Sequence, residues 1–188
     1  DTLTLNSDQV EKIRKYVEEE FDKNELQALQ GINPFYAENS IVALDFIRIP
    51  NLSKGFDPEW ETNGKIEEAC TFLHKWVTAQ GLKNTKAEII REKGRTPLLF
   101  IDVEGSTPGC ETILMYGHYD KQPWFTGWRE GLGPITPVIE GRKLYGRGSS
   151  DDGYACFGAV LSIKALQKHD LPHPRCVILI EGDEESEG

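Results

Sequence analysis

The sequence predicts an α/β fold, a three-layer αβα arrangement with a mixed, mostly parallel central sheet. Three observations lead to this class. Apolar residues recur at helical spacing in the first part of the chain. Short, nearly continuous apolar runs follow, as in strands that are buried on both faces. A further helical stretch separates the last two of these runs, which gives the strand–helix–strand order typical of layered α/β domains.

Three helices are expected before the first strand. The first spans 7–30, with Ser7 as N-cap, glycine and proline beyond its end, and an apolar face made of Val10, Ile13, Val17, Phe21 and Leu29. The second covers roughly 38–47 and ends before a proline. The third runs from about 63 to 80, stops at Gly81 and turns inward the residues Ile66, Ala69, Phe72, Leu73 and Trp76.

The period of the pattern then changes from helix to strand. Strands are expected at 86–91, 97–103, 112–117 and 176–180, and a helix at 153–168 precedes the last of them. The run TILMYG at 112–117 is apolar throughout, which predicts a central strand covered on both faces. Residues 121–147 are rich in Gly, Pro and Trp and predict a long loop with short strands.

Composition excludes several classes of protein. Acidic residues outnumber basic ones 31 to 21, for a net charge of −10 and a pI near 4.9. This balance argues against a general binder of nucleic acid or of anionic membranes. No window approaches the roughly 18 apolar residues of a membrane span, and the N-terminus has no signal-peptide pattern. The four cysteines form no CxxC motif, so free thiols in a reducing, cytoplasmic compartment are expected.

The first polar cluster is Gly117-His118-Tyr119-Asp120, directly after the apolar run TILMY. Residues two apart in an extended chain point to the same side, so His118 and Asp120 would face one site. Imidazole is a common zinc ligand, and a neighbouring carboxylate fixes its tautomer and raises its basicity. The alternative interpretation is a surface turn that contains a His and an Asp.

The second cluster, 145–153, reads YGRGSSDDG and leads into a predicted helix. A dinucleotide-binding loop is excluded because Asp151 stands at the third glycine position, where a carboxylate would repel a pyrophosphate. Helix capping explains one of the adjacent residues Asp151 and Asp152 better than both.

The third cluster, 181–187, carries five acidic residues after the apolar run CVILI. A solvated turn is the simple interpretation, but the ends of strands are where α/β folds place their ligands. Carboxylates gathered there raise one another's pKa values, and a divalent metal removes that cost. Together the three clusters offer a histidine with several carboxylates, a donor set that suits zinc or a similar ion. A carboxylate shared by two metals, with a free glutamate as base, is a two-metal hydrolase arrangement.

The order of these clusters resembles the aminoacylase/carboxypeptidase family of co-catalytic zinc peptidases, and within it the carnosinase-like, nonspecific dipeptidases. The matching segments are MYGHYDKQPW (115–124), KLYGRGSSDDG (143–153) and EGDEES (181–186). One departure is that the family often has a lysine before the glycine of its DDKG-like motif, whereas Gly153 directly follows Asp152 here.

The resemblance implies a site with two divalent metal ions, zinc or alternatively manganese. It implies metal ligands at His118, Asp151 and Glu185, with Asp151 bridging both ions. It also implies that Asp120 orients His118 and that Glu184 is the general acid/base. Glu184 would take a proton from the attacking water and pass it to the leaving amine of a small peptide or an N-acyl amino acid.

The expected site lacks some of its ligands. The resemblance implies a further acidic ligand and a second histidine later in the chain, together with a smaller lid domain inserted after this region. The other histidines, His74, His169 and His173, lie on a helix or in a Pro-rich loop and are not expected to bind metal. Residues 1–188 are therefore expected to be the N-terminal portion of a catalytic domain, with a helical extension over about 1–35. The portion alone is expected to be inactive, and the full-length protein is expected to be a homodimer.

Two other functions stay open at this point. An N-acyl-amino-acid deacylase or desuccinylase would use the same machinery on a different substrate, and a truncated, non-catalytic module would keep only the fold. Three aromatic residues near the HxD motif either pack the long loop, which is the preferred interpretation, or form a pocket wall: Trp124, Phe125 and Trp128.

Overall fold

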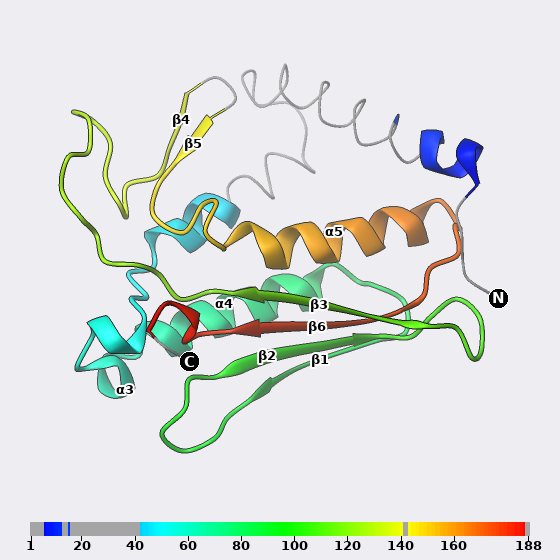
Figure 1. Cartoon of the computed structure of the whole chain (residues 1–188), viewed down its shortest axis with the longest axis horizontal. Coiled ribbons are helices and arrows are strands. Elements are labelled where there is room, and N and C mark those ends of the chain that lie inside the picture. Colours follow the sequence, from blue (N-terminus) through cyan, green and yellow to red (C-terminus); the bar gives the residue numbers. More distant parts are fainter. Residues whose placement is uncertain (1–5, 13–14, 16–41, 141–142, 187–188) are drawn as a thin grey trace.

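The computed structural model describes residues 6–12, 15, 42–140 and 143–186 (Figure 1). Of the predicted first helix, residues 7–12 and 15 are helical, and the rest lies outside the described residues. The same holds for most of the expected extension over about 1–35. The second predicted helix is present at 42–48.

The remaining elements follow the predicted order. They are η1 (Lys54–Phe56), α3 (Trp60–Asn63), α4 (Lys65–Ala79), β1 (Thr85–Ile90), β2 (Leu98–Val103), β3 (Thr112–His118), β4 (Val138–Glu140), β5 (Lys143–Tyr145), α5 (Tyr154–Lys168), β6 (Arg175–Glu181) and η2 (Glu184–Ser186). The four main strands differ from their predicted bounds by no more than one residue at either end. Gly81, the predicted helix stop, has a φ of 64°, a left-handed conformation that glycine adopts without a steric cost.

The main sheet is mixed, with the strand order β1-β2-β6-β3. β1 pairs with β2 and β2 pairs with β6 in antiparallel fashion, and only β3 and β6 are parallel. The α/β class is therefore confirmed, but the prediction of a mostly parallel sheet is wrong for the described strands. The physical reason is connectivity. A short loop joins β1 to β2 and favours a hairpin, whereas the α5 crossover joins β3 to β6 and permits a parallel pair.

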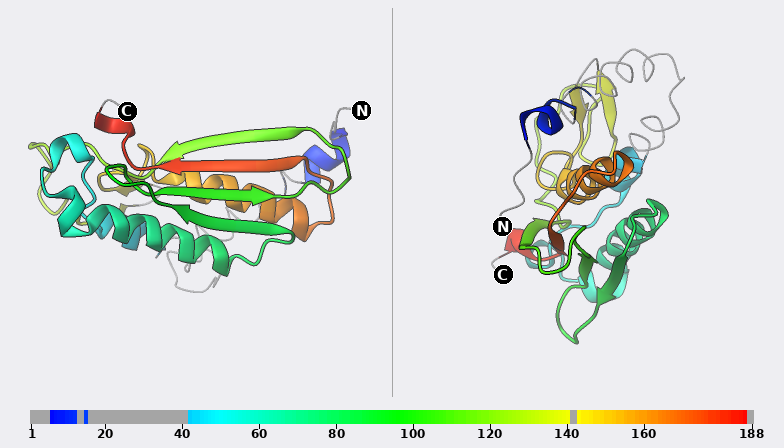
Figure 2. Two further views of the ribbon diagram at one scale, coloured as in Figure 1. Left: turned by 90° about the horizontal axis from the view of Figure 1, so that it is seen from below. Right: turned by 90° about the vertical axis from the view of Figure 1, so that its right-hand side faces the viewer.

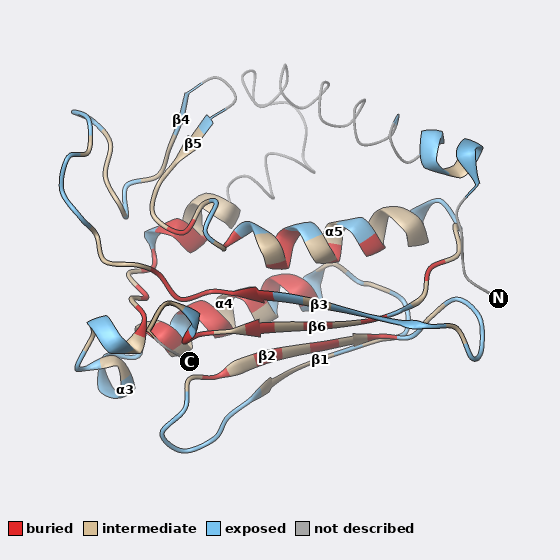
Figure 3. Cartoon of the chain, viewed as in Figure 1, coloured by how far each residue is buried: buried red, intermediate tan, exposed pale blue. Residues whose placement is uncertain are grey.

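Helices cover one face of this sheet. Both α4 and α5 lie on the same side (Figure 2), and the strand residues that face them are buried in a common core: Leu99, Ile101, Val103, Cys176, Ile178 and Ile180. The alternate residues on the other face are only partly buried (Figure 3), namely Leu98, Phe100, Val177 and Leu179. The described residues thus form two layers rather than the predicted three.

β3 is an edge strand in the described part of the chain, not the central strand that its apolar sequence predicts. Leu114 and Tyr116 are 63% and 55% exposed on the face that lacks a described helix. The sequence run was apolar enough for burial on both sides, but β6 is its only partner in the described sheet. The burial prediction therefore fails for the outer face of this strand.

The core lies between the sheet and the two long helices. α4 buries most of its predicted apolar face, and α5 contributes Cys156, Phe157, Val160 and Ile163. The rings of Trp76 and Phe157 meet edge to face, with centroids 4.6 Å apart, an arrangement favoured by the aromatic quadrupole. All four cysteines are free thiols, as expected. Among the described helices, none combines the length and the apolar composition needed to cross a bilayer.

Candidate metal centre

The carboxyl ends of β3 and β6 lie side by side and bring the first and third polar clusters together. Their parallel register pairs His118 with Glu181. The segment after β3 therefore runs beside η2, which begins three residues after β6 ends. This edge of the sheet is where parallel strands of α/β folds present ligand-binding residues.

His118 is held by a buried carboxylate. Its Nδ1 lies 3.2 Å from Oδ1 of Asp120, and the two side chains are 6% and 0% exposed. Burial acts to lower the pKa of His118, but the hydrogen bond and charge of Asp120 outweigh it and raise the pKa to about 9. With Nδ1 occupied by Asp120, the other ring nitrogen, Nε2, is left to face the remaining acidic residues.

Asp120 also organises η2 through the backbone. Its Oδ1 accepts a hydrogen bond from the Glu184 amide at 3.3 Å, and its Oδ2 accepts one from the Glu185 amide at 3.0 Å. Burial acts to raise the pKa of Asp120, yet hydrogen bonds from His118, Ser53 and the Glu185 amide lower it on balance. Asp120 therefore stays ionised and joins the histidine to the acidic turn.

Asp151 approaches from the loop between β5 and α5. Its Oδ1 lies 3.3 Å from Nε2 of His118, and its side chain is 64% exposed. The neighbouring Asp152, joined to it by a cis peptide bond, accepts a hydrogen bond from the His118 amide at 3.3 Å. Burial raises the pKa of Asp152, with a further contribution from the charge of Asp151. The two aspartates thus have separate partners, which agrees with the view that capping alone does not explain both.

Glu185 completes a group of three possible ligands. One atom each from His118, Asp151 and Glu185 lie within 4.8 Å of one another. Burial and the charge of Asp151 raise the pKa of Glu185, and its Oε1 is buried without a hydrogen-bond partner. Such an orphaned carboxylate oxygen beside a second carboxylate and an imidazole fits a divalent cation of the zinc type. A metal would supply the missing partner and relieve the repulsion.

Glu184 lies beside this group but outside it. Its Oε2 is 3.7 Å from Nε2 of His118, and its side chain is 46% exposed. A general base must be close to the reacting water without being bound as a ligand, and a position beside the three possible ligands but outside their group is where such a base would lie.

Several supporting residues were not predicted from the sequence. Ser53 contacts Ser186 through their hydroxyls, Lys54 forms an ion pair with Asp183, and Gln122 donates a hydrogen bond to Glu185. The Ser53–Ser186 pair spans 133 residues, so no local spacing could reveal it. Gln122 could have been suspected from the sequence, because it follows the HxD motif by only two residues.

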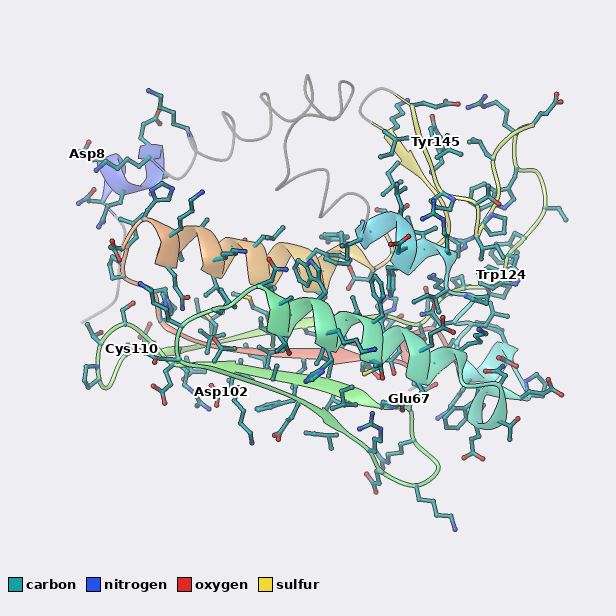
Figure 4. All side chains as sticks on the ribbon, turned by 180° about the vertical axis from the view of Figure 1, so that it is seen from behind. Asp8, Glu67, Asp102, Cys110, Trp124 and Tyr145 are labelled. Atoms are coloured by element: carbon teal, nitrogen blue, oxygen red, sulfur yellow. The ribbon has the colours of Figure 1, made fainter. Side chains whose placement is uncertain are left out.

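The remaining residues singled out in the sequence, namely the other histidines and the aromatic residues near the HxD motif, do not belong to this acidic group. His74 bonds to the Ala87 carbonyl, and His173 is buried beside Pro174, so neither joins the acidic group. Trp124, at the opposite end of the molecule from Cys110 (Figure 4), accepts a hydrogen bond on its carbonyl from the indole of Trp128. Phe125 is 63% exposed and lies under the Arg147 guanidinium.

In comparisons with known proteins, the segment that carries these motifs matches one family model. Residues 114–188 match the family model described as peptidase family M20/M25/M40. The chain is 40% identical over 87 residues to the Cys-Gly metallodipeptidase DUG1 of Candida albicans, covering 44% of this chain and 18% of that protein. It is 39% identical over 79 residues to the succinyl-diaminopimelate desuccinylase of Gluconobacter oxydans, covering 41% of this chain and 20% of that protein. The matched residues thus span about a fifth of these relatives.

The fold agrees with the same family. Human carnosine dipeptidase 1 superposes with a TM-score of 0.64 at 19% identity, covering 95% of this chain and 35% of that chain. The predicted resemblance to carnosinase-like metallopeptidases is confirmed by the match of residues 114–188 and by the curated relatives, and the solved structure shows that the fold is similar.

Proposed function

We infer that this chain, whose residues 114–188 match the model of peptidase family M20/M25/M40, is the N-terminal portion of a di-metal hydrolase that cleaves the amide bond of dipeptides. The observation that carries this inference is the meeting of His118, Asp151 and Glu185 within 4.8 Å, with Glu184 beside them. This arrangement combines a metal-binding donor set with a carboxylate that is free to move a proton.

Different residues of the site would bind metal and transfer protons. His118, Asp151 and Glu185 would hold metal, with Asp151 reaching the site from the loop between β5 and α5. Bound divalent ions would supply Lewis acidity, which acidifies water and polarises a carbonyl. Asp120 keeps the His118 ring oriented with Nε2 toward the site. Glu184 would accept the proton of the attacking water and return it to the leaving amine.

The metal, partners and location are further parts of this proposal. One imidazole with several carboxylates favours zinc, with manganese as the alternative. The remaining ligands and the lid domain would come from outside residues 1–188. The free thiols of all four cysteines are consistent with a reducing, cytoplasmic compartment. We expect the full-length protein to be a homodimer.

A second candidate function has its own support. The desuccinylase relative matches at nearly the same identity as the dipeptidase relative, 39% against 40%. The same ligands and base would then act on an N-acyl amino acid. The dipeptidase remains preferred because the segments GRGSSDDG and EGDEES resemble that branch.

A combined metal and substrate assay tests these functions. Full-length protein is stripped of metal, reloaded with zinc or manganese, and assayed with Cys-Gly and with an N-succinyl amino acid. We expect two metal equivalents and faster hydrolysis of Cys-Gly. Faster cleavage of the N-succinyl compound favours the second candidate, and metal binding without hydrolysis of either compound favours a non-catalytic module. Residues 1–188 alone should bind metal weakly and hydrolyse neither compound, so robust turnover by this portion would contradict the proposal.

A further inference from the structure

We propose that Lys121 is a positioning residue that joins the end of β3 to the Asp151 loop and to the helix at 42–48, and thereby sets the geometry of the metal site. The inference rests on the proposed function, since it concerns how the same site is held in place. Neither the HxD motif nor the role of Asp120 accounts for a lysine at this point of the chain.

The Lys121 side chain is fully buried, and its ammonium group is directed at backbone oxygen atoms. Nζ lies 3.0 Å from the Phe46 carbonyl, 3.2 Å from the Ile47 carbonyl and 2.7 Å from the Ile49 carbonyl. These carbonyls stand at and just beyond the end of the helix at 42–48, where backbone acceptors lack partners within the helix. A cation there also interacts favourably with the negative end of the helix dipole.

The geometry of these contacts suits a charged lysine. An ammonium has three donors, which matches the three carbonyl acceptors, whereas a neutral amine has only two. Nζ also lies 4.6 Å from the centroid of the Phe46 ring, a cation–π distance. Burial lowers the pKa of Lys121 to about 7 because it disfavours the charged form, whereas the three carbonyls and the ring favour that form. An apolar side chain at this position could make none of the three hydrogen bonds.

The aliphatic stem of Lys121 packs against Gly148 in the Asp151 loop. A Cβ placed on Gly148 would lie 2.7 Å from Cε of Lys121 and 3.1 Å from its Cγ. Gly148 has a φ of 80° and accepts the Gly153 amide on its carbonyl at 3.0 Å, so it closes the turn that carries Asp151. The loop therefore rests directly on the lysine stem, and a shift of that stem moves Asp151 relative to His118.

The backbone of Lys121 extends the same connection to η2. Its carbonyl accepts the Ser53 amide at 3.0 Å, and the Ser53 hydroxyl contacts Ser186. Lys121 thus contacts the helix at 42–48, the Asp151 loop and Ser53, which in turn contacts η2. The helix also contacts the Asp151 loop directly, since a Cβ on Gly146 would lie 2.5 Å from Cγ2 of Ile47. Lys121 adds a contact to all three segments beside Asp120.

The experiment compares Lys121→Met with Leu73→Ala in the full-length protein. The methionine keeps an unbranched apolar stem but removes the charge and all three donors. Leu73 is fully buried in α4, so its truncation destabilises the core through a cavity without touching the site. Hydrogen exchange of the amides of 146–153 is measured in the metal-free protein. Zinc affinity and the visible spectrum of the cobalt-substituted protein are measured alongside it.

We expect Lys121→Met to speed exchange in 146–153 by about tenfold, weaken zinc binding by about 10–100-fold and alter the cobalt spectrum. Leu73→Ala should lower thermal stability but leave the cobalt spectrum unchanged and zinc affinity within about threefold of wild type. The proposal is overturned if Lys121→Met leaves the loop and the spectrum unchanged, or if both variants change them equally. If Lys121→Met does not fold, Lys121→Gln, which retains an amide donor, is judged by the same criteria.

The two proposals fail in different ways. A wild-type protein that binds no metal and cleaves no dipeptide would refute the proposed function. The exchange rates of 146–153 in the metal-free protein would still decide whether Lys121 fixes the loop.

Discussion

The two sides of the candidate centre are built differently. After β3, His118 and Asp120 are 6% and 0% exposed, and each has a protein partner. On the opposite side, Asp151 and Glu184 are 64% and 46% exposed, and Glu185 has an orphaned buried oxygen. The first side is part of the fold and exists without metal. The second side gathers three carboxylates around the single imidazole of His118, and this excess of negative charge is what an ion would balance.

The largest expected effect concerns the base on the exposed side. Glu184→Gln in the full-length protein should lower kcat by about 10²–10⁴-fold, because the amide cannot accept the proton of water. Metal content should stay near that of wild type, since Glu184 lies outside the ligand group. Turnover and metal stoichiometry are measured together, with the exposed Glu130→Gln as control. Simultaneous loss of metal would show that Glu184 is a ligand.

A second prediction contrasts the two sides directly. Asp120→Ala should lower the unfolding free energy of the metal-free protein by about 3 kcal/mol, because His118 and two backbone amides lose a buried acceptor. Asp151→Ala should change it by less than about 0.5 kcal/mol, since its side chain is mostly exposed. Urea unfolding of both variants measures the difference. Equal losses would remove the distinction between a folded side and a metal-dependent side.

Metal itself should stabilise the protein through the exposed side. Zinc at a hundredfold excess over its dissociation constant should raise the unfolding free energy by about 2.7 kcal/mol. Thermal unfolding with and without zinc measures this gain, and a chelator should abolish it. The Asp151→Asn variant should gain much less, because it lacks one anionic ligand. An unchanged gain in that variant would place the ion elsewhere.

The smallest effect is a pH dependence of the metal-free protein. The pKa of His118 is raised from 6.5 to about 9, so the folded state holds this proton more tightly than the unfolded state. The resulting stability is fully present below pH 6.5 and is lost as the pH rises toward 9. Between pH 7 and 8 the contribution of His118 to the unfolding free energy should fall by about 1 kcal/mol. The lowered pKa of Lys121 acts in the opposite direction over the same range, so the His118 contribution is measured as the difference between wild type and His118→Asn in urea unfolding at each pH. A difference that does not shrink as the pH rises would contradict the prediction.

Local patterns in the sequence predicted the strands and the three polar clusters. The strand bounds followed from apolar runs and the three polar clusters from the ends of those runs, whereas the choice of His118, Asp151 and Glu185 as metal ligands came from the resemblance to a known family. The number of layers and the direction of the strands were harder to predict from the sequence. The apolar run at 112–117 predicts a buried central strand, although β3 is an edge strand with an exposed face in the described sheet. The residues that hold the site residues in place were not predicted, because their partners are distant in the sequence. Lys121 reaches carbonyls 72 to 75 residues away, and such distant partners leave no periodic signal.

The bond between the Glu184 amide and Asp120 also has a consequence for how the protein is made. The two residues are 64 positions apart. At ribosomal speeds of about 5–20 residues per second, roughly 3–13 seconds pass between their synthesis. During that interval the nascent chain already contains His118 and Asp120 but lacks the acidic turn. The histidine would therefore be made well before its neighbours, and the newborn chain would acquire its affinity for metal late, once β6 has been added to the sheet.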